Sequence, residues 1–362
     1  MKKLLLIVLC LPMIGFGQQT YVPDDNFEAY LEANGMGNGI ANDDYVNTAS
    51  IDTVIYLDLS STWGIVDLTG IEDFTALTYL NCSYHQLTFL DISQNPALTE
   101  LYCSYNQITS LDVSANTALT KLHCNGNFPY GNPNSNLDVN SNTALTELYC
   151  SENGLTTLDL SQNTFLAELD CSENDLTTLD LSQNTFLTYL NCARNFSITG
   201  LDVSTNSAIE YLDCHDNLIN SLDVNNKLSL IYLYCQDNKI TNLDLSQSSN
   251  LIELSCGDNQ LTSLNIRNGN NNNFTYFSCD DNFSLNCINI DNVAWATANL
   301  TDIDPQHYFS TNCPPSSIQE EHTINKELLK VTDLLGRETK QTNQALFYLY
   351  DDGTVEKRIV VE

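Results

Sequence analysis

The sequence has few basic residues. Among its 362 residues, 13 lysines and arginines stand against 46 aspartates and glutamates, and the formal net charge is -33 at pH 7. Residues 18–315 are more acidic still, with 37 acids and five bases. Because phosphate groups repel a chain of this charge, the composition argues against nucleic acid as a partner.

Long apolar runs are confined to the N-terminus. Residues 1–17 combine two lysines with an apolar run over about residues 4–14, followed by small residues. This pattern predicts a secretory signal peptide that is cleaved before Gln18. A lipid anchor on Cys10 is the alternative, but it needs a small residue at the preceding position, where Leu9 lies. No other run approaches the ~20 apolar residues of a membrane helix, so we expect an exported chain without a transmembrane span.

What the chain has in place of these features is a repeat. Residues 145–165 and 166–186 are nearly identical, and each segment has a cysteine at the same place. The cysteine recurs about every 21 residues, at Cys82, Cys103, Cys124, Cys150, Cys171, Cys192, Cys214, Cys235, Cys256 and Cys279. One longer interval holds residues 127–136, which are rich in Pro, Gly and Asn and predict an inserted loop. A fixed period of this kind indicates stacked structural units.

The unit reads L-x-x-L-x-C-x-x-N-x-L-T-x-L-D-L-S-x-N-x-x. In one copy the signature residues are Leu166, Leu169, Cys171, Asn174 and Leu176; His85 takes the Asn place in the first copy. The pattern resembles the leucine-rich repeat family, in the 21-residue form of bacterial surface proteins with an internalin-like architecture. Its alternating apolar positions are those of a short strand. We therefore expect a mainly β solenoid over residues 51–285, with about ten repeats and a parallel sheet on one side.

The second half of each unit repeats the L-x-x-L-x-L-x-x-N shape and leaves no room for a helix. Strand or extended backbone is therefore expected on both sides of the solenoid. The repeated asparagines are expected to bond main-chain groups where the chain turns. They include Asn106, Asn153, Asn174, Asn217, Asn238 and Asn259.

The repeated cysteine occupies a core position, where a free thiol acts as a small apolar group. Neighbouring strands are close enough for a column of disulfides in an oxidising compartment. Parallel side chains in register point the same way, however, so we expect a reduced ladder. Cys287 and Cys313 lie beyond the repeats, and a disulfide between them is predicted to close a C-terminal cap over residues 286–315.

The N-terminal cap is predicted over residues 18–50. Asp24 or Asp25 can cap a helix that carries Phe27 and Leu31 on one face, and Gly35 would end it. A solenoid needs such caps to cover the apolar ends of the stack.

Residues 316–362 predict a small β module with a hairpin about an Asp-Gly turn. This segment resembles the C-terminal sorting domain of type IX secretion. The matching residues are Asp333, Gly336, Arg337, Gly353, Glu356 and Lys357. The resemblance implies export through the outer membrane of a Bacteroidetes-like bacterium, with the type IX machinery as a partner, and then release or attachment at the cell surface. A β module that simply ends the protein is the alternative.

One set of acids forms a column in the second half-unit, called here the Asp column: Asp91, Asp112, Asp138, Asp159, Asp180, Asp202, Asp223 and Asp244. Stacked one strand apart, adjacent carboxylates would repel each other by ~0.9 kcal/mol in water before salt screening. Hydrogen bonds from main-chain N–H groups or hydroxyls are the expected compensation, so no cofactor is expected. Calcium bound at Asp159, Asp180 and Asp202 is the weaker alternative.

Tyrosines and carboxylates occupy the outward positions beside the cysteine strand. Such a surface suits a protein or glycan partner, although tyrosine also favours exposed strands for their own sake. The candidate ligand-binding residues are Tyr79, Tyr102, Glu147, Tyr149, Glu168, Asp170, Tyr189, Tyr211, Asp213, Tyr232, Tyr234 and Tyr276.

Catalysis has little support. The histidines have no metal-binding spacing, and G-x-S-x-G and H-E-x-x-H are lacking. The sequence therefore predicts a secreted or surface-displayed, non-enzymatic binding module. A calcium-stabilised adhesion scaffold is the first alternative. A glycan-degrading enzyme is the second; it would need two carboxylates in unlike environments, whereas the repeat places its acids in identical ones.

Overall fold

The computed structural model describes residues 17–127, 136–314, 328–332, 345–350 and 355–359. The predicted signal peptide and nearly all of the predicted insertion loop lie outside these residues. The chain divides into two compact units, residues 1–313 and residues 314–362. In the part that is described, no helix has the length and apolar character needed to cross a membrane.

The N-terminal cap pairs two short antiparallel strands, β1 (Gln19–Tyr21) and β2 (Tyr45–Asn47), beside the helices α1 (Asp25–Ala33) and α2 (Thr48–Ile51). Asp24 begins α1, because its carboxylate accepts the backbone N–H groups of Asn26 and Phe27 at 3.0 Å each. The apolar face of α1 is buried at Phe27 and Leu31. The helix predicted from the sequence is therefore confirmed.

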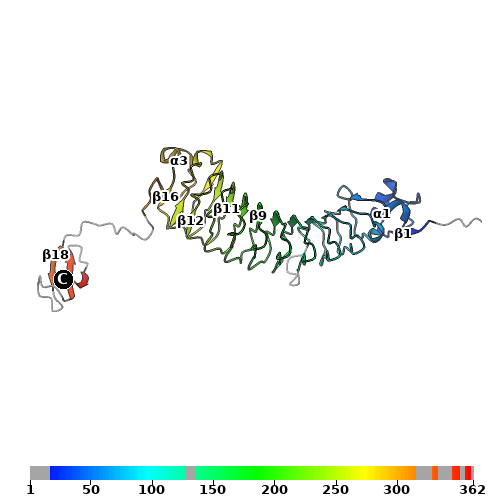
Figure 1. Cartoon of the computed structure of the whole chain (residues 1–362), viewed down its shortest axis with the longest axis horizontal. Helices are drawn as coiled ribbons and strands as arrows, with labels where there is room; N and C mark the ends of the chain where they lie inside the picture. The colour runs from blue at the N-terminus through cyan, green and yellow to red at the C-terminus, as the bar shows by residue number, and fades with distance from the viewer. Residues whose placement is uncertain (1–16, 128–135, 315–327, 333–344, 351–354, 360–362) are drawn as a thin grey trace, which may run out of the picture. The chain divides into compact units, whose positions relative to one another are not determined.

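The solenoid is built on one parallel sheet, whose strands lie side by side in Figure 1. Equivalent residues of successive turns pair, such as Leu190 with Leu212. Its strands are β3 (Tyr56–Asp58), β4 (Tyr79–Asn81), β5 (Glu100–Tyr102), β6 (Lys121–His123), β7 (Glu147–Tyr149), β8 (Glu168–Asp170), β9 (Tyr189–Asn191), β10 (Tyr211–Asp213), β11 (Tyr232–Tyr234), β13 (Glu253–Ser255) and β15 (Tyr276–Ser278).

The predicted architecture, a mainly β solenoid with a parallel sheet, is confirmed. The number of turns was underestimated, since the sheet has 11 strands rather than about ten. The first turn lies within the predicted solenoid but outside the series of cysteines, because Leu59 stands at its cysteine position, buried like the thiols that follow. Apolar character, and not the thiol itself, is therefore what this position requires.

The opposite side of the solenoid is only partly a sheet. Four strands pair there, β12 (Asn242–Asp244), β14 (Ser263–Asn265), β16 (Cys287–Asn289) and β17 (Tyr308–Ser310). In the earlier turns that are described, Asp side chains accept from backbone N–H groups and Asn side chains donate to backbone carbonyls instead. On this opposite side, the expected extended backbone forms a regular sheet only near the C-terminal end of the solenoid.

The C-terminal segment continues the stack. β16 and β17 extend the second sheet in parallel register, so residues 287–310 are further turns and not only the separate cap that the sequence predicted. The short helix α3 (Val293–Asn299) buries Ala296, and the η2 turn (Asn271–Asn273) lies near it. Cys287 and Cys313 form the expected disulfide, with Cα atoms 5.7 Å apart.

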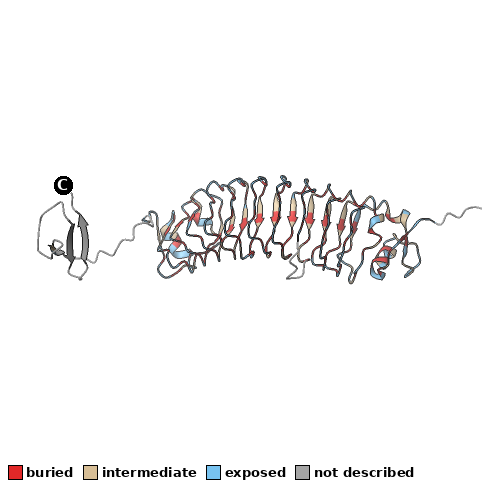
Figure 2. Cartoon of the chain, turned by 90° about the horizontal axis from the view of Figure 1, so that it is seen from below, coloured by how far each residue is buried: buried red, intermediate tan, exposed pale blue. Residues whose placement is uncertain are grey.

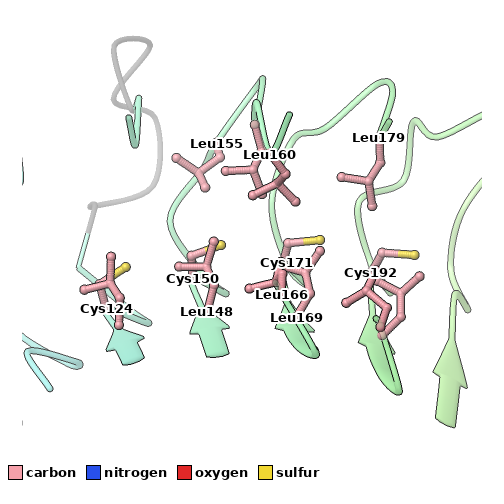
Figure 3. Packing of buried hydrophobic residues seen from close by; sticks show 14 of the residues in the cluster. Cys124, Leu148, Cys150, Leu155, Leu160, Leu166, Leu169, Cys171, Leu179 and Cys192 are labelled. Atoms are coloured by element: carbon pink, nitrogen blue, oxygen red, sulfur yellow. The ribbon is translucent and has the colours of Figure 1, made fainter. Parts of the chain in front are cut away.

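The core is a set of ladders that run through the stack. Figure 3 shows Cys124, Cys150, Cys171 and Cys192 at equivalent places in successive turns. All ten repeat cysteines are free and buried. Burial raises the pKa of the Cys82 and Cys124 thiols to about 12, so they stay protonated at neutral pH and are poor nucleophiles or metal ligands. The expected apolar role of the cysteine ladder is confirmed, and its reduced state stays a prediction.

The second unit contains a three-stranded antiparallel sheet of β18 (Leu328–Thr332), β19 (Ala345–Tyr350) and β20 (Val355–Ile359). Pairing of β19 with β20 confirms the antiparallel strands of the predicted hairpin, in which Glu356 lies opposite Tyr348 and Lys357 opposite Phe347. The predicted Asp-Gly turn lies outside the described residues. Four predicted sorting residues, Asp333, Gly336, Arg337 and Gly353, lie outside the described residues. Their role in sorting stays a prediction.

Candidate functional site

The outer face of the 11-stranded sheet carries a nearly continuous row of aromatic rings, called here the ring ladder. In strands such as β9 the middle residue is buried and the first and third residues are half-buried, as the colours of Figure 2 indicate. The rings belong to the first and third residues of the strands. Adjacent ring centroids are 4.3–6.3 Å apart. In order, the ladder contains Tyr56, Tyr79, Tyr102, His123, Tyr149, Tyr189, Tyr211, Tyr232 and Tyr234.

Carboxylates of the same face hold several tyrosine hydroxyls. Tyr102 donates to Glu100 at 2.9 Å, Tyr149 donates to Glu168 at 2.7 Å, and Tyr234 donates to Glu253. Burial among neighbouring rings raises the pKa of Tyr79 and Tyr189 to about 12. The phenols are therefore neutral donors at physiological pH, and their rings are fixed before any partner arrives.

Two clusters of charged and histidine side chains lie along the ring ladder. Glu147 accepts from Lys121 at 3.0 Å and lies 2.6 Å from His123 Nε2. His215 Nδ1 lies 2.6 Å from the Asp213 carboxylate, and this hydrogen bond raises the pKa of His215. Because Glu147 is already paired with Lys121 and Asp213 with His215, these carboxylates offer less free charge to a ligand than the sequence suggested.

Most predicted binding residues do lie together on this face, with three qualifications. Asp170 caps its own turn by accepting the backbone N–H and hydroxyl of Ser172. Asp213 is buried, with only 8% of its surface exposed. Tyr276 is exposed and lies outside the ring ladder. Two ladder members are not among the predicted binding residues. Tyr56 belongs to the first turn, which has no cysteine, and His123 was considered only as a possible metal ligand and not as an aromatic ring.

A second column, called here the strand-end column, consists of the residue two places after each cysteine. All its members have positive φ, between 46° and 64°. The members are Tyr84, Tyr105, Gly126, Glu152, Glu173, Arg194, Asp216, Asp237, Asp258 and Asp281. The C-x-x-N spacing contains the signal for this column, since its second x precedes the turn-forming asparagine, or His85 in the first copy.

The column changes in character along the solenoid. Its first two members are aromatic, and from Glu152 onward it is acidic apart from Arg194, which contacts Glu173 and Asp216. Burial and the neighbouring carboxylates raise the pKa of Asp237 and Asp258. The C-terminal strand ends therefore carry unrelieved negative charge.

The Asp column is compensated by the main chain, as expected. Each of its carboxylates accepts the backbone N–H two residues later, at 2.8–3.0 Å. For the three calcium candidates, Asp159, Asp180 and Asp202, these hydrogen bonds lower the pKa. Calcium at this column remains a prediction.

Another group of carboxylates comes closer together than any in the Asp column. In the part of the chain that is described, Asp25, Glu28 and Asp44 place ligand oxygens within 4.8 Å of one another. Glu28 already accepts the backbone N–H groups of Asp43 and Asp44 at 3.2 and 3.3 Å. These residues lie on α1 and in the loop before β2, so no local pattern predicts that they meet.

Parallel strands in register, inward Leu and Cys ladders and asparagines at the turns define a leucine-rich repeat solenoid. No family model matches the chain. A stretch of 75 residues is 40% identical to internalin J of Listeria monocytogenes serotype 4b (strain F2365), covering 21% of this chain but only 8% of that protein.

Two solved structures from Listeria monocytogenes are similar. The functional domain of InlJ, which includes a cysteine ladder, is 25% identical, with 94% of this chain and 97% of that chain covered and a TM-score of 0.47. The internalin InlF is 20% identical, with 81% and 96% covered and a TM-score of 0.50. At this identity the likeness to InlF concerns the fold alone.

Proposed function

We propose that this chain is a non-enzymatic binding protein that recognises a partner protein through the ring ladder. The observation that carries the proposal is the row of fixed rings across successive strands. Aromatic side chains held in place lose little conformational entropy when they bind, and they dominate the energetics of protein interfaces. The parallel sheet supplies a rigid support, and no second layer covers this face in the described residues.

Export to the medium or the cell surface is part of the proposal. It is supported by the lysine-led apolar segment at residues 1–17 and by the β module at residues 316–362. Intact-mass measurement of the chain isolated from culture medium tests both ends. The expected mature chain begins at Gln18 and lacks the tail, and a full-length mass in the medium would refute the processing.

The binding face is tested by a triple variant, Tyr211→Ala, Tyr232→Ala and Tyr234→Ala. Partners are first captured from surface-protein arrays with the wild-type chain, and each is then titrated against the variants. We expect the triple variant to bind at least about 100-fold more weakly, since central aromatic residues at interfaces contribute ~2 kcal/mol or more each.

A matched control replaces Phe165 and Phe186 by alanine. These rings are also exposed and stacked, with centroids 6.2 Å apart, but they lie outside the ring ladder. The control is expected to bind like the wild type. If both variants retained every captured partner, the ring ladder would not be the binding surface. Hydrolysis of polysaccharides or peptides by the purified chain would overturn the non-enzymatic assignment.

A further inference from the structure

An open hollow of about 480 Å³ lies beside the first turns of the solenoid. Its walls come from the segments that follow β3, β4 and β5, and not from the strands that carry the ring ladder. Three of its residues are exposed aromatics: Trp63 at 81%, Tyr84 at 61% and Tyr105 at 40%. Large apolar side chains this exposed and gathered in one concave place mark a binding site more often than a chance arrangement.

The two tyrosines form a fixed platform. Their ring centroids are 4.9 Å apart and the rings are inclined by only 16°. Each backbone N–H is bonded to the next turn, Tyr84 to the Ser104 carbonyl at 2.9 Å and Tyr105 to the Asn125 carbonyl at 2.7 Å. The rings are therefore positioned by the stacked main chain and not by their own rotamers alone.

Gly126 makes this platform possible. A Cβ atom at residue 126 would lie 2.6 Å from Cδ1 of Tyr105, which is closer than such atoms approach. The ring of Tyr105 thus lies across the next turn at the one place in the strand-end column that has no side chain. Substitution of Gly126 would move the ring, and its φ of 64° adds strain for any other residue.

The opposite wall is held by the N-terminal cap. The Asp24 carboxylate that begins α1 also accepts the backbone N–H groups of Val66 at 2.7 Å and Asp67 at 3.1 Å. Asn26 donates to the Gly64 carbonyl at 3.0 Å. The segment that carries Trp63 is therefore tied to α1, and Trp63 lines the hollow from this segment. Such preorganisation lowers the entropic cost of binding.

The lining carries no charge, although the chain is strongly acidic. Its remaining polar side chains include the neutral groups of Ser60, Thr62 and Gln86. His85 also lines the hollow, and its Nε2 bonds the Leu59 carbonyl at 3.1 Å. Burial lowers the pKa of His85, so it is neutral as well. A cationic ligand would prefer the many carboxylates elsewhere, and an anionic ligand would be repelled by the chain as a whole.

These features fit an uncharged sugar chain. A pyranose ring presents an apolar face of C–H groups, which packs on aromatic rings, and an edge of hydroxyls, which hydroxyl and amide side chains can bond. We propose that the hollow formed by Trp63, Tyr84 and Tyr105 binds a neutral oligosaccharide, at a site separate from the ring ladder.

The chain carries its own reporter for this site. It has two tryptophans; Trp63 is exposed, and Trp295 packs against the core. The test titrates the full chain with neutral hexasaccharides of glucose, mannose and N-acetylglucosamine, and with a hexasaccharide of galacturonic acid. Tryptophan fluorescence and calorimetry are the readouts. We expect at least one neutral sugar to give a saturable blue shift, and the acidic sugar to give none.

Variants locate the binding. Trp63→Ala and Tyr84→Ala are each expected to weaken sugar binding at least about tenfold, measured by calorimetry. Gly126→Ala is expected to weaken binding as well, by displacing Tyr105, while the melting temperature shows that the chain still folds. The Phe165→Ala, Phe186→Ala control keeps wild-type binding, because that exposed ring pair lacks the hollow.

The outcomes separate this proposal from the proposed protein-binding function. Sugar binding that survives in the triple variant Tyr211→Ala, Tyr232→Ala, Tyr234→Ala supports a separate site. The proposal is overturned if no neutral sugar binds, if the acidic sugar binds as tightly, or if Trp63→Ala and Tyr84→Ala bind like the wild type. Loss of a captured protein partner in these two variants, without any sugar binding, would instead assign the hollow to the protein interface.

Discussion

Most repeat units contain two buried asparagines, and the two ladders that they form differ in how fully they are bonded. Asn174 follows a cysteine strand and makes five hydrogen bonds, three from its amide N–H₂ group and two to its carbonyl oxygen. Asn184 lies on the opposite side and makes two, both as a donor. Among the described residues its side-chain oxygen, Oδ1, has no partner.

This difference shows where the register of the solenoid is set. Asn174 accepts N–H groups from the preceding turn and donates to carbonyls of both turns, so it joins two turns through both ends of its amide. Asn184 only donates, to carbonyls of the preceding turn. The side that carries the ring ladder is therefore the more tightly bonded side, as a preformed binding surface requires.

The largest effect is expected from removing these amides. Asn174→Ala should destabilise the chain by about 4 kcal/mol and Asn184→Ala by about 2 kcal/mol, since buried main-chain groups left without partners cost ~1–3 kcal/mol each. Urea unfolding followed by circular dichroism measures both. Gln183→Ala, an exposed neighbour, should change stability by no more than about 0.5 kcal/mol. Equal losses of unfolding free energy in the two variants would contradict the proposed difference in bonding between the two sides of the solenoid.

The less bonded ladder contains a natural exception. Lys227 occupies the asparagine place, is buried with 2% of its surface exposed, and donates from Nζ to the Val203 carbonyl. This bond joins residues 24 positions apart, as the bond from Asn184 to Leu160 does. The ammonium group replaces the amide as donor, but it carries a charge into the core, and burial lowers its pKa.

Lys227→Asn should therefore stabilise the chain by about 1 kcal/mol at pH 7, because the amide supplies two donors without a buried charge. A lysine with a lowered folded-state pKa costs stability below that pKa, and the cost declines as pH rises toward the unfolded value of 10.5. The gain should thus be smaller at pH 10 than at pH 7 in urea unfolding. Lys239→Asn, at an exposed position, serves as the control. A destabilised Lys227→Asn variant would contradict this account.

The fold was predictable because the period of the sequence places equivalent residues in register. Cysteine and leucine ladders, turn asparagines and the capped helix α1 all follow from local patterns that act within one or two turns. The first turn was left uncounted for an equally local reason, since Leu59 stands in place of the cysteine by which turns were counted. Residues 287–310 contain no such repeat, and their pairing with β14 depends on tertiary contacts.

The candidate site was predictable in part. Alternation along each strand identifies the outward columns, and so most of the ring ladder. It does not show that Asp170 and Asp213 are engaged by Ser172 and His215, because those bonds depend on side-chain geometry. The hollow beside Trp63 was missed for a different reason. It requires Asp24 to bond a loop 42 residues away, and no repeat pattern records that contact.

The smallest changes in stability are expected for two aspartates with different partners, one in the Asp column and one in the strand-end column. Asp180→Asn should destabilise the chain slightly, because the charge strengthens the hydrogen bond from the Ser182 N–H and lowers the pKa of Asp180. Asp258→Asn should stabilise it, by about 0.3 kcal/mol after solvent screening, because burial and repulsion from Asp237 raise the pKa of Asp258. Asparagine tolerates the left-handed φ at residue 258 as well as aspartate does.

Both stability changes depend on ionised carboxylates, so the direction in which each changes with pH can be derived. A lowered folded-state pKa gives Asp180 a contribution that is present above the unfolded value of 3.8 and lost as pH falls through the folded pKa. A raised pKa makes Asp258 costly at neutral pH, and protonation relieves that cost as pH falls toward 3.8. Melting temperatures at pH 7 should therefore move in opposite directions for the two variants. Added salt should remove part of the gain at residue 258, since salt screens the repulsion from Asp237 but not the cost of burial. Shifts of the same sign would mean that net charge, and not the local partner of each carboxylate, governs the two columns.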